Sequence, residues 1–142
     1  MSTSTTAYNI AKEKMLDNDL FSQWLGIELL DIKPGFCRLQ MTIREEMTNG
    51  FKIAHGGICY SLADSALAFA SNAHGKMAVS IETSISHLTK LKAGEVVIAD
   101  AKEIFCSEKT GVYQVEIKNQ ENKLIALFKG TVYRSSKNWL EN

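Results

Sequence analysis

The run of apolar and small residues between positions 58 and 73 constrains the fold of this chain more than any other stretch. Its apolar and small positions are Ile58, Cys59, Leu62, Ala63, Ala66, Leu67, Ala70 and Ala73. They cover more than one helical face, which is typical of a helix buried inside a domain. Asp64 is the only charged residue in this run. An ionised carboxylate is costly to bury without a partner. Asp64 is therefore a candidate acid, base or nucleophile, or it lies on a solvent-facing strip of the helix or is satisfied by a nearby serine.

Two glycines, Gly56 and Gly57, stand at the start of the predicted helix, directly after His55. They leave the first helical N–H groups unshielded, at the positive end of the helix dipole. Such donors are what an oxyanion hole requires. Asp64 follows Gly56 by eight residues, which is about 12 Å along a helix. We therefore expect Gly56 to work with Asp64 of a second copy, brought close by antiparallel helices in a twofold dimer.

The remaining sequence predicts one helical segment and six strands. The apolar spacing within residues 8–25 predicts a short helix and a helical turn, with a break near Asn18. Runs typical of strands lie at 27–32, 36–43, 77–88, 95–105, 111–118 and 124–134. Pro34 and Gly35 predict a hairpin turn between the first two strands. The order of these elements predicts an α+β fold, with a curved antiparallel sheet of about six strands around the long helix.

Length and charge favour one compact domain. The chain has 142 residues, the usual size of a single domain, and we expect residues 1–6 and 135–142 to be loose ends. Sixteen basic and sixteen acidic residues cancel, so no charge pattern for nucleic acid or an anionic membrane exists. There is no apolar run of about 18 residues and no signal-peptide pattern, so we expect no membrane span.

The cysteines and histidines suggest neither disulfides nor a metal site. Cys37, Cys59 and Cys106 are odd in number and have no paired spacing, which favours reduced thiols in the cytoplasm. Three scattered histidines add no metal-ligand pattern, so we expect no metal. Cys59 lacks a matching His-Asn arrangement, and we interpret it as a small core residue rather than a nucleophile.

Three short segments, Asn49-Gly50, His55-Gly56-Gly57 and residues 61–66, together resemble the signature of the hotdog-fold acyl-CoA thioesterases. Residues 110–117 and 124–130 resemble the last two strands of the phenylacetate-pathway (PaaI-type) subfamily. The resemblance implies a hotdog fold and hydrolysis of an acyl-CoA thioester to a free acid and CoA. The implied substrates are aryl-acetyl-CoA, such as phenylacetyl- or hydroxyphenylacetyl-CoA, or medium-chain acyl-CoA. It implies no separate cofactor, and a homodimer with shared active sites that pairs into a homotetramer.

The resemblance also implies roles for individual residues. The Gly56 N–H would bind the thioester oxygen, while Asp64 of the facing subunit would either attack the carbonyl or activate a water. Asn49 would hold the water or the carbonyl, or it forms only a simple turn with Gly50. His55 would set the loop and hydrogen-bond at the site, or it only fills the N-cap region of the helix. The residues implied near the reacting water or the CoA are Ser65, Ser80, Gly57, His87, Lys90, Ser107, Lys109 and Thr110. Many relatives have proline at the position of Lys90, which puts the local turn and an inherited CoA contact there in doubt.

Two open questions follow from this resemblance. Phe21 and Trp24 would contact the acyl group, or they are ordinary core or interface aromatics. The chain would hydrolyse the thioester, or it would only bind or sense an acyl-CoA. The combination of Asp64 with Gly56 and Asn49 favours hydrolysis, because a pure binder needs no carboxylate beside the thioester. A hotdog hydratase would need an acid–histidine pair that this loop does not show.

Overall fold

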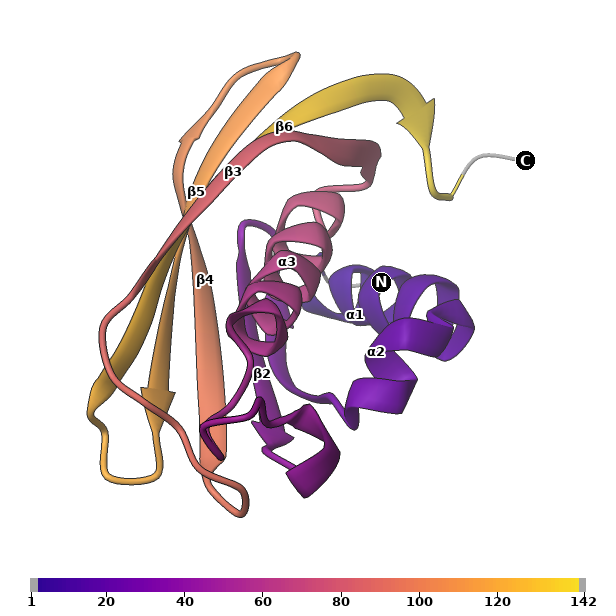
Figure 1. Cartoon of the computed structure of the whole chain (residues 1–142). Helices are drawn as coiled ribbons and strands as arrows, with labels where there is room; N and C mark the ends of the chain where they lie inside the picture. Colours follow the sequence, from indigo (N-terminus) through magenta and orange to yellow (C-terminus); the bar gives the residue numbers. More distant parts are fainter. Residues whose placement is uncertain (1–2, 141–142) are drawn as a thin grey trace.

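Helix α3 (Gly56–Asn72) lies in the hollow of a curved six-stranded sheet in the computed structural model, which describes residues 3–140 (Figure 1). The strands are β1 (Glu28–Lys33), β2 (Phe36–Thr42), β3 (Lys76–His87), β4 (Val96–Cys106), β5 (Thr110–Asn119) and β6 (Leu124–Asn138). Their order in the sheet is β1-β2-β4-β5-β6-β3, and every neighbouring pair is antiparallel. The two edges of the sheet are therefore β1 and β3.

The core forms where α3 meets the inner face of the sheet. Leu62, Leu67 and Phe69 of α3 are at most 1% exposed, and Val115 and Phe128 on the strands are equally buried. The helix approaches β6 so closely that a Cβ atom at Gly130 would lie 2.5 Å from the Leu67 side chain. A larger residue at position 130 would therefore displace the Leu67 side chain. The predicted burial of the long helix is confirmed.

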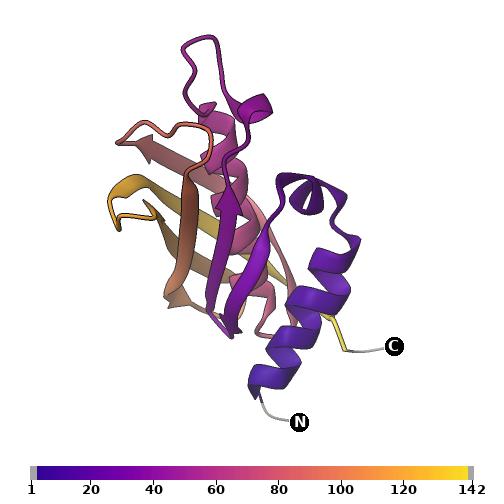
Figure 2. The same ribbon diagram turned by 90° about the horizontal axis from the view of Figure 1, so that it is seen from below.

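The N-terminal segment is helical and ends in a capped turn. It consists of α1 (Thr3–Tyr8), a π-helical stretch (Asn9–Met15), a short 3-10 turn (Leu16–Asn18) and α2 (Leu20–Leu25). Asp19 caps α2, because its Oδ1 accepts a hydrogen bond of 3.0 Å from the Ser22 N–H. The break predicted near Asn18 is therefore confirmed. Figure 2 shows these helices beside the sheet.

The ends of the chain are more ordered than the sequence predicts. Residues 3–6 form the start of α1 and residues 135–138 belong to β6. The Trp139 indole N–H donates to Oδ1 of the buried Asn72 at 2.8 Å, and the Trp139 backbone N–H donates to the Gly75 carbonyl at 2.8 Å. These contacts hold the end of β6 against the end of α3, so the prediction of loose ends is wrong for these residues. Residues 1, 2, 141 and 142 lie outside the described part of the chain.

Among residues 3–140, no helix is both long enough and apolar enough to cross a membrane.

Candidate active site

Asp64 lies on the partly exposed strip of α3. Between Leu62 and Asn72, every residue except Asp64 and Ala68 is buried. These two follow Gly57 and Ser61 at helical spacing, so the four lie on one side of the helix. The interpretation of Asp64 as a residue on a solvent-facing strip therefore holds within one chain.

The carboxylate of Asp64 has no hydrogen-bond partner in the described part of the chain. Partial burial raises the pKa of Asp64, and the nearby negative charge of Asp19 raises it further. A half-buried carboxylate without partners is unusual, since such groups normally pair with a donor. The environment of Asp64 is therefore consistent with a base that completes its surroundings only when another molecule binds.

A hollow of about 280 Å³ opens beside Asp64, between α3 and the beginning of β3. Ser80 lines this hollow, and Met15 and Trp139 form part of its wall. Ser65 does not line it, because its hydroxyl shares a buried 2.8 Å hydrogen bond with the Ser22 hydroxyl. The structure therefore places Ser80 with Asp64, and turns Ser65 toward α2.

His55 caps the N-terminus of α3. Its Nδ1 accepts a hydrogen bond of 3.3 Å from the Gly57 N–H, so the neutral ring carries its proton on Nε2. The Gly56 N–H donates to no other group among residues 3–140. The Gly57 N–H is thus bonded to the capping side chain. The Gly56 N–H has no acceptor among residues 3–140 and lies at the positive end of the helix dipole. The Gly56 N–H is therefore available to a substrate oxygen, whereas the Gly57 N–H is occupied by the cap.

A second hollow, of about 450 Å³, surrounds Gly56 and collects most of the expected loop residues. Its lining includes Asn49, His55, Gly56, His87 and Lys90. The His87 ring lies against the glycine, since a Cβ atom at Gly56 would be only 3.1 Å from its Nε2. The Asn49 side-chain oxygen accepts a hydrogen bond of 2.9 Å from the Phe51 N–H, which fixes the turn before the helix.

Cys59 lines the same hollow but is only 4% exposed. Burial raises the pKa of its thiol to about 11, so the thiol stays protonated at neutral pH. It is therefore not an activated nucleophile, which agrees with its interpretation as a small core residue.

The other three residues expected to contact CoA lie away from Gly56 in the same chain. Ser107, Lys109 and Thr110 form the turn between β4 and β5, where the Ser107 hydroxyl accepts a 3.1 Å hydrogen bond from the Thr110 N–H. Thr110 in this turn pairs with Tyr133 of β6, and Tyr133 pairs in turn with Val79 near the beginning of β3. Lys90, in contrast, follows the end of β3. One chain therefore does not bring this turn and Lys90 to the same place.

Phe21 and Trp24 lie on the surface, more than half exposed, and stack with ring centroids 6.2 Å apart. The Arg44 guanidinium lies 5.0 Å from the Trp24 ring. Both rings line a hollow of about 310 Å³ that also includes Gly57 and Ser61. They are not core residues, and they lie next to the strip of α3 that carries Asp64.

Sequence reasoning missed two groups of polar residues. Asp19 and Ser22 lie beneath Asp64 and Ser65, and only the local Asp-x-x-Ser capping pattern pointed to their contact with each other. The second group comprises His74, Glu103 and Cys106. His74 lies 29 positions before Glu103 in the sequence, so it meets the other two only in the fold. These three are the described residues that could hold a metal ion.

Comparisons with known proteins agree with this geometry. Residues 51–126 match the model of the Thioesterase superfamily. A putative esterase of Archaeoglobus fulgidus is 46% identical over 87% of this chain and 80% of that protein. The acyl-coenzyme A thioesterase PaaI of Escherichia coli is 39% identical over 84% of this chain and 86% of that protein. The solved structure of E. coli PaaI, from the phenylacetic acid degradation operon, has a TM-score of 0.94 at 37% identity. It covers 96% of this chain and 99% of that one. The hotdog fold expected from the sequence is thereby confirmed.

Proposed function

Because the chain belongs to the thioesterase superfamily and is a thioester hydrolase, we propose that its substrate is an acyl-CoA and that two copies share each active site. One observation carries this proposal. α3 holds both the backbone N–H of Gly56 and the carboxylate of Asp64, and neither has a hydrogen-bond partner among residues 3–140. The first suits a developing oxyanion and the second suits the attack on a thioester.

The unpaired edge of β3 supports the sharing of sites. Val79 and Ile81 on this edge are 64% and 63% exposed, and an exposed edge strand is a template for pairing with another chain. The hollow beside Asp64 lies at the beginning of β3, and the hollow around Gly56 lies at its end. Antiparallel pairing of two β3 strands about a twofold axis sets each beginning opposite the other's end. Asp64 of one copy then faces Gly56 of the other.

In this arrangement the Gly56 N–H binds the thioester oxygen and stabilises the negative charge of the tetrahedral intermediate. Asp64 of the second copy either attacks the carbonyl carbon, forming an acyl-enzyme anhydride, or removes a proton from the attacking water. The CoA thiolate leaves in either case. Both routes require ionised Asp64, and Ser80 beside it offers a hydroxyl to the water.

The surroundings of the site indicate the two ends of the substrate. The stacked rings of Phe21 and Trp24 lie beside the strip of α3 that carries Asp64. They favour an aryl-acetyl group, such as phenylacetyl or hydroxyphenylacetyl, over a medium-chain acyl group. Lys90 near His87 suits the CoA phosphates. Antiparallel pairing of β3 would also bring the turn at 107–110 of the second copy to the end of β3 that precedes Lys90.

The free thiols of Cys37, Cys59 and Cys106 suit the reducing cytoplasm.

Thiol release from a panel of CoA esters tests the activity and supplies the acyl preference. The panel contains phenylacetyl-, hydroxyphenylacetyl-, benzoyl-, hexanoyl- and palmitoyl-CoA. Asp64→Asn should lose at least about a hundredfold in kcat, the scale expected for acid–base chemistry. Glu116→Gln, which changes a carboxylate on strand β5 instead of helix α3, is the matched control and should keep full activity. An Asp64→Asn protein as active as wild type contradicts the mechanism, and binding of the esters without hydrolysis by wild type indicates a binding module instead.

Complementation between two inactive variants tests whether the sites are shared. Gly56→Pro removes the N–H at the first position of α3, where proline suits the backbone, and should cost about 10²–10³ in kcat. Gly56→Ala is its control, because it adds a Cβ against His87 but keeps the N–H. In a mixed dimer of Gly56→Pro and Asp64→Asn, one of the two sites has both groups. Random co-assembly should therefore restore about a quarter of wild-type activity, whereas sites within one chain would show no recovery.

A further inference from the structure

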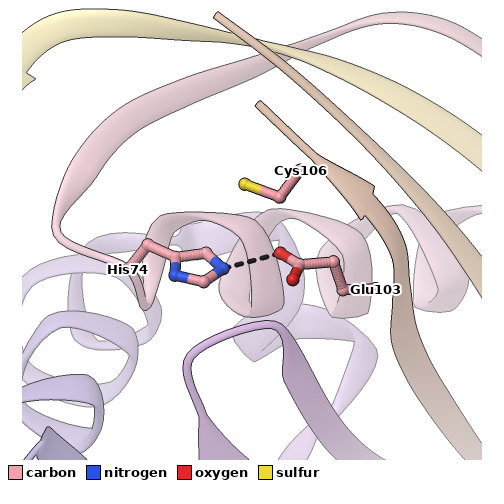
Figure 3. Close-up of side chains that lie close together, drawn as sticks. All are labelled: His74, Glu103 and Cys106. Atoms are coloured by element: carbon pink, nitrogen blue, oxygen red, sulfur yellow. Dashed lines mark hydrogen bonds and ion pairs between the residues drawn. The ribbon is translucent and has the colours of Figure 1, made fainter. Parts of the chain in front are cut away.

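A second group of polar side chains lies at the other end of α3 (Figure 3). His74 follows the last turn of the helix, and Glu103 and Cys106 lie near the end of β4. Their nitrogen, oxygen and sulfur atoms all lie within 4.8 Å of one another. Because α3 has 17 residues and is therefore about 25 Å long, this group is separate from the hollow around Gly56.

A β-bulge brings Glu103 and Cys106 to the same side of the sheet. In a regular strand, residues three apart point to opposite faces. The register between β4 and β5 shifts here, since Glu103 pairs with Tyr113 while Phe105 pairs with Val112. The extra residue turns the Cys106 side chain back to the side of Glu103, which is the re-aiming that bulges often provide next to functional sites.

The Glu103 carboxylate is held in place from several sides. Its Oε1 accepts a hydrogen bond of 2.8 Å from the buried Tyr113 hydroxyl and lies 2.6 Å from His74 Nε2. The β1–β2 turn packs against it, because a Cβ atom at Gly35 would lie 3.2 Å from the carboxyl carbon. Burial alone would raise the pKa of Glu103, but the hydrogen bonds from His74 and Tyr113 lower it below its usual value. The group is therefore an ionised, pre-oriented ligand.

We propose that His74, Glu103 and Cys106 bind one Zn²⁺ ion, with a water in the fourth position. Imidazole nitrogen, carboxylate oxygen and thiolate sulfur are the ligands that zinc takes in proteins, at about 2.0–2.3 Å. In Figure 3 the three side chains converge on one gap, and the ion takes the place of the proton between His74 and Glu103. Tyr113 keeps its hydrogen bond to the carboxylate and orients it, as partners of metal ligands commonly do.

The charges and protons of this site balance. Zinc binding releases the thiol proton of Cys106 to solvent. The proton that the neutral His74 ring carries on Nε2, toward Glu103, moves to Nδ1 by exchange with solvent, so that Nε2 can bind the metal. The two positive charges of the ion then meet one carboxylate and one thiolate. Affinity should therefore fall as the pH falls, by about tenfold per pH unit while one proton is displaced.

Two cations near the thiol affect this equilibrium. Arg134 and Lys76 favour the thiolate of Cys106, whereas burial and the charge of Glu103 raise the pKa of the thiol overall. Arg134 is held by a 2.6 Å hydrogen bond to the Ser107 carbonyl, and its buried Nε has no partner among the described residues. The cations also repel a metal ion, so this three-ligand site should bind zinc less tightly than four-ligand structural sites.

Titration of the metal-free protein with Co²⁺, followed by displacement with Zn²⁺, tests the site directly. A thiolate bound to Co²⁺ gives a charge-transfer absorption in the near ultraviolet. We expect this absorption to saturate at one Co²⁺ per chain and to disappear when Zn²⁺ is added. Cys106→Ser should abolish it, and His74→Ala should weaken binding at least about tenfold. His87→Ala is the matched control at the other end of α3 and should bind Co²⁺ like wild type.

Thermal unfolding with and without Zn²⁺ gives a second readout that needs no absorption band. Zinc should raise the Tm of wild type and of His87→Ala, because a ligand of the native state stabilises it, and leave the Tm of Cys106→Ser unchanged. The proposal is overturned if wild type shows no charge-transfer band. It is also overturned if the band survives in Cys106→Ser, where only the buried Cys37 and Cys59 remain. Circular dichroism of each variant establishes that it is folded before either measurement.

Discussion

Two partly buried carboxylates on this fold, Asp64 and Glu103, have opposite surroundings. Asp64 accepts no hydrogen bond from the described residues, and partial burial raises its pKa. Glu103 accepts one from Tyr113 and pairs with His74, which lowers its pKa despite burial. Similar exposure therefore says little about role, whereas the presence or absence of local donors says much. Within one chain, Glu103 is paired, whereas Asp64, to which we assign a role in a site shared with a second copy, has no donor among residues 3–140.

The largest expected effect separates activity from stability at Asp64. Asp64→Asn should lose at least about a hundredfold in kcat for acyl-CoA hydrolysis, as argued above, while its free energy of unfolding at pH 7 equals or exceeds that of wild type. The stability is kept because the substitution removes a desolvated charge that no donor compensates. Chemical denaturation beside thiol-release kinetics measures both quantities. A clear loss of stability would mean that Asp64 has structural partners, and it would contradict the claim that Asp64, unlike Glu103, lacks local donors.

The next largest effect is on stability at Glu103. Glu103→Ala should lower the free energy of unfolding by about 1–3 kcal/mol in buffer with a chelator, because it leaves the buried Tyr113 hydroxyl without its acceptor. Glu116→Ala is the matched control, since its carboxylate on β5 has only a 4.0 Å contact with Lys118. That variant should stay within about 0.5 kcal/mol of wild type. Equal losses in the two variants would show that the hydrogen bonds of Glu103 add nothing.

The pH dependence should differ in sign between the two carboxylates. The pKa of Glu103 is lowered on folding, so its contribution to stability is complete above the unfolded value of about 4.3 and is lost as the pH falls through the folded value. The pKa of Asp64 is raised, so its ionisation weakens the fold as the pH rises through that value. Denaturation between about pH 3.5 and 7 should therefore show two opposite trends in the free energy of unfolding. The deficit of Glu103→Gln relative to wild type should shrink as the pH falls, and the stability of Asp64→Asn relative to wild type should increase as the pH rises. The reverse of these trends would contradict both assignments.

The sequence predicted the elements of this fold better than the contacts between them. The long helix, expected within 58–73, spans Gly56–Asn72, and each expected strand is present within a few residues, because alternation and apolar runs are local properties. The hydrogen bond between the Ser65 and Ser22 hydroxyls and the bond from the Gly57 N–H to His55 depend on side-chain directions that spacing does not encode. The meeting of Cys106 with Glu103 depends on the bulge in β4. A single chain does not show how two copies pack together, so the pairing of Asp64 of one copy with Gly56 of another stays a prediction.

The smallest expected effect adjusts Asp64 through its neighbour Asp19. The negative charge of Asp19 contributes to the raised pKa of Asp64. Asp19→Asn removes that charge while asparagine still caps α2 and accepts the bond from the Ser22 N–H. The acid limb of the kcat profile should therefore move to lower pH, by less than about one unit, with little change in kcat at neutral pH. Asp17→Asn, at the other end of the same break, is the control and should leave the profile in place. A limb that stays fixed in Asp19→Asn would mean that desolvation alone sets the pKa of Asp64. A shift to higher pH would mean that Asp64 is not the group that limits the reaction in acid.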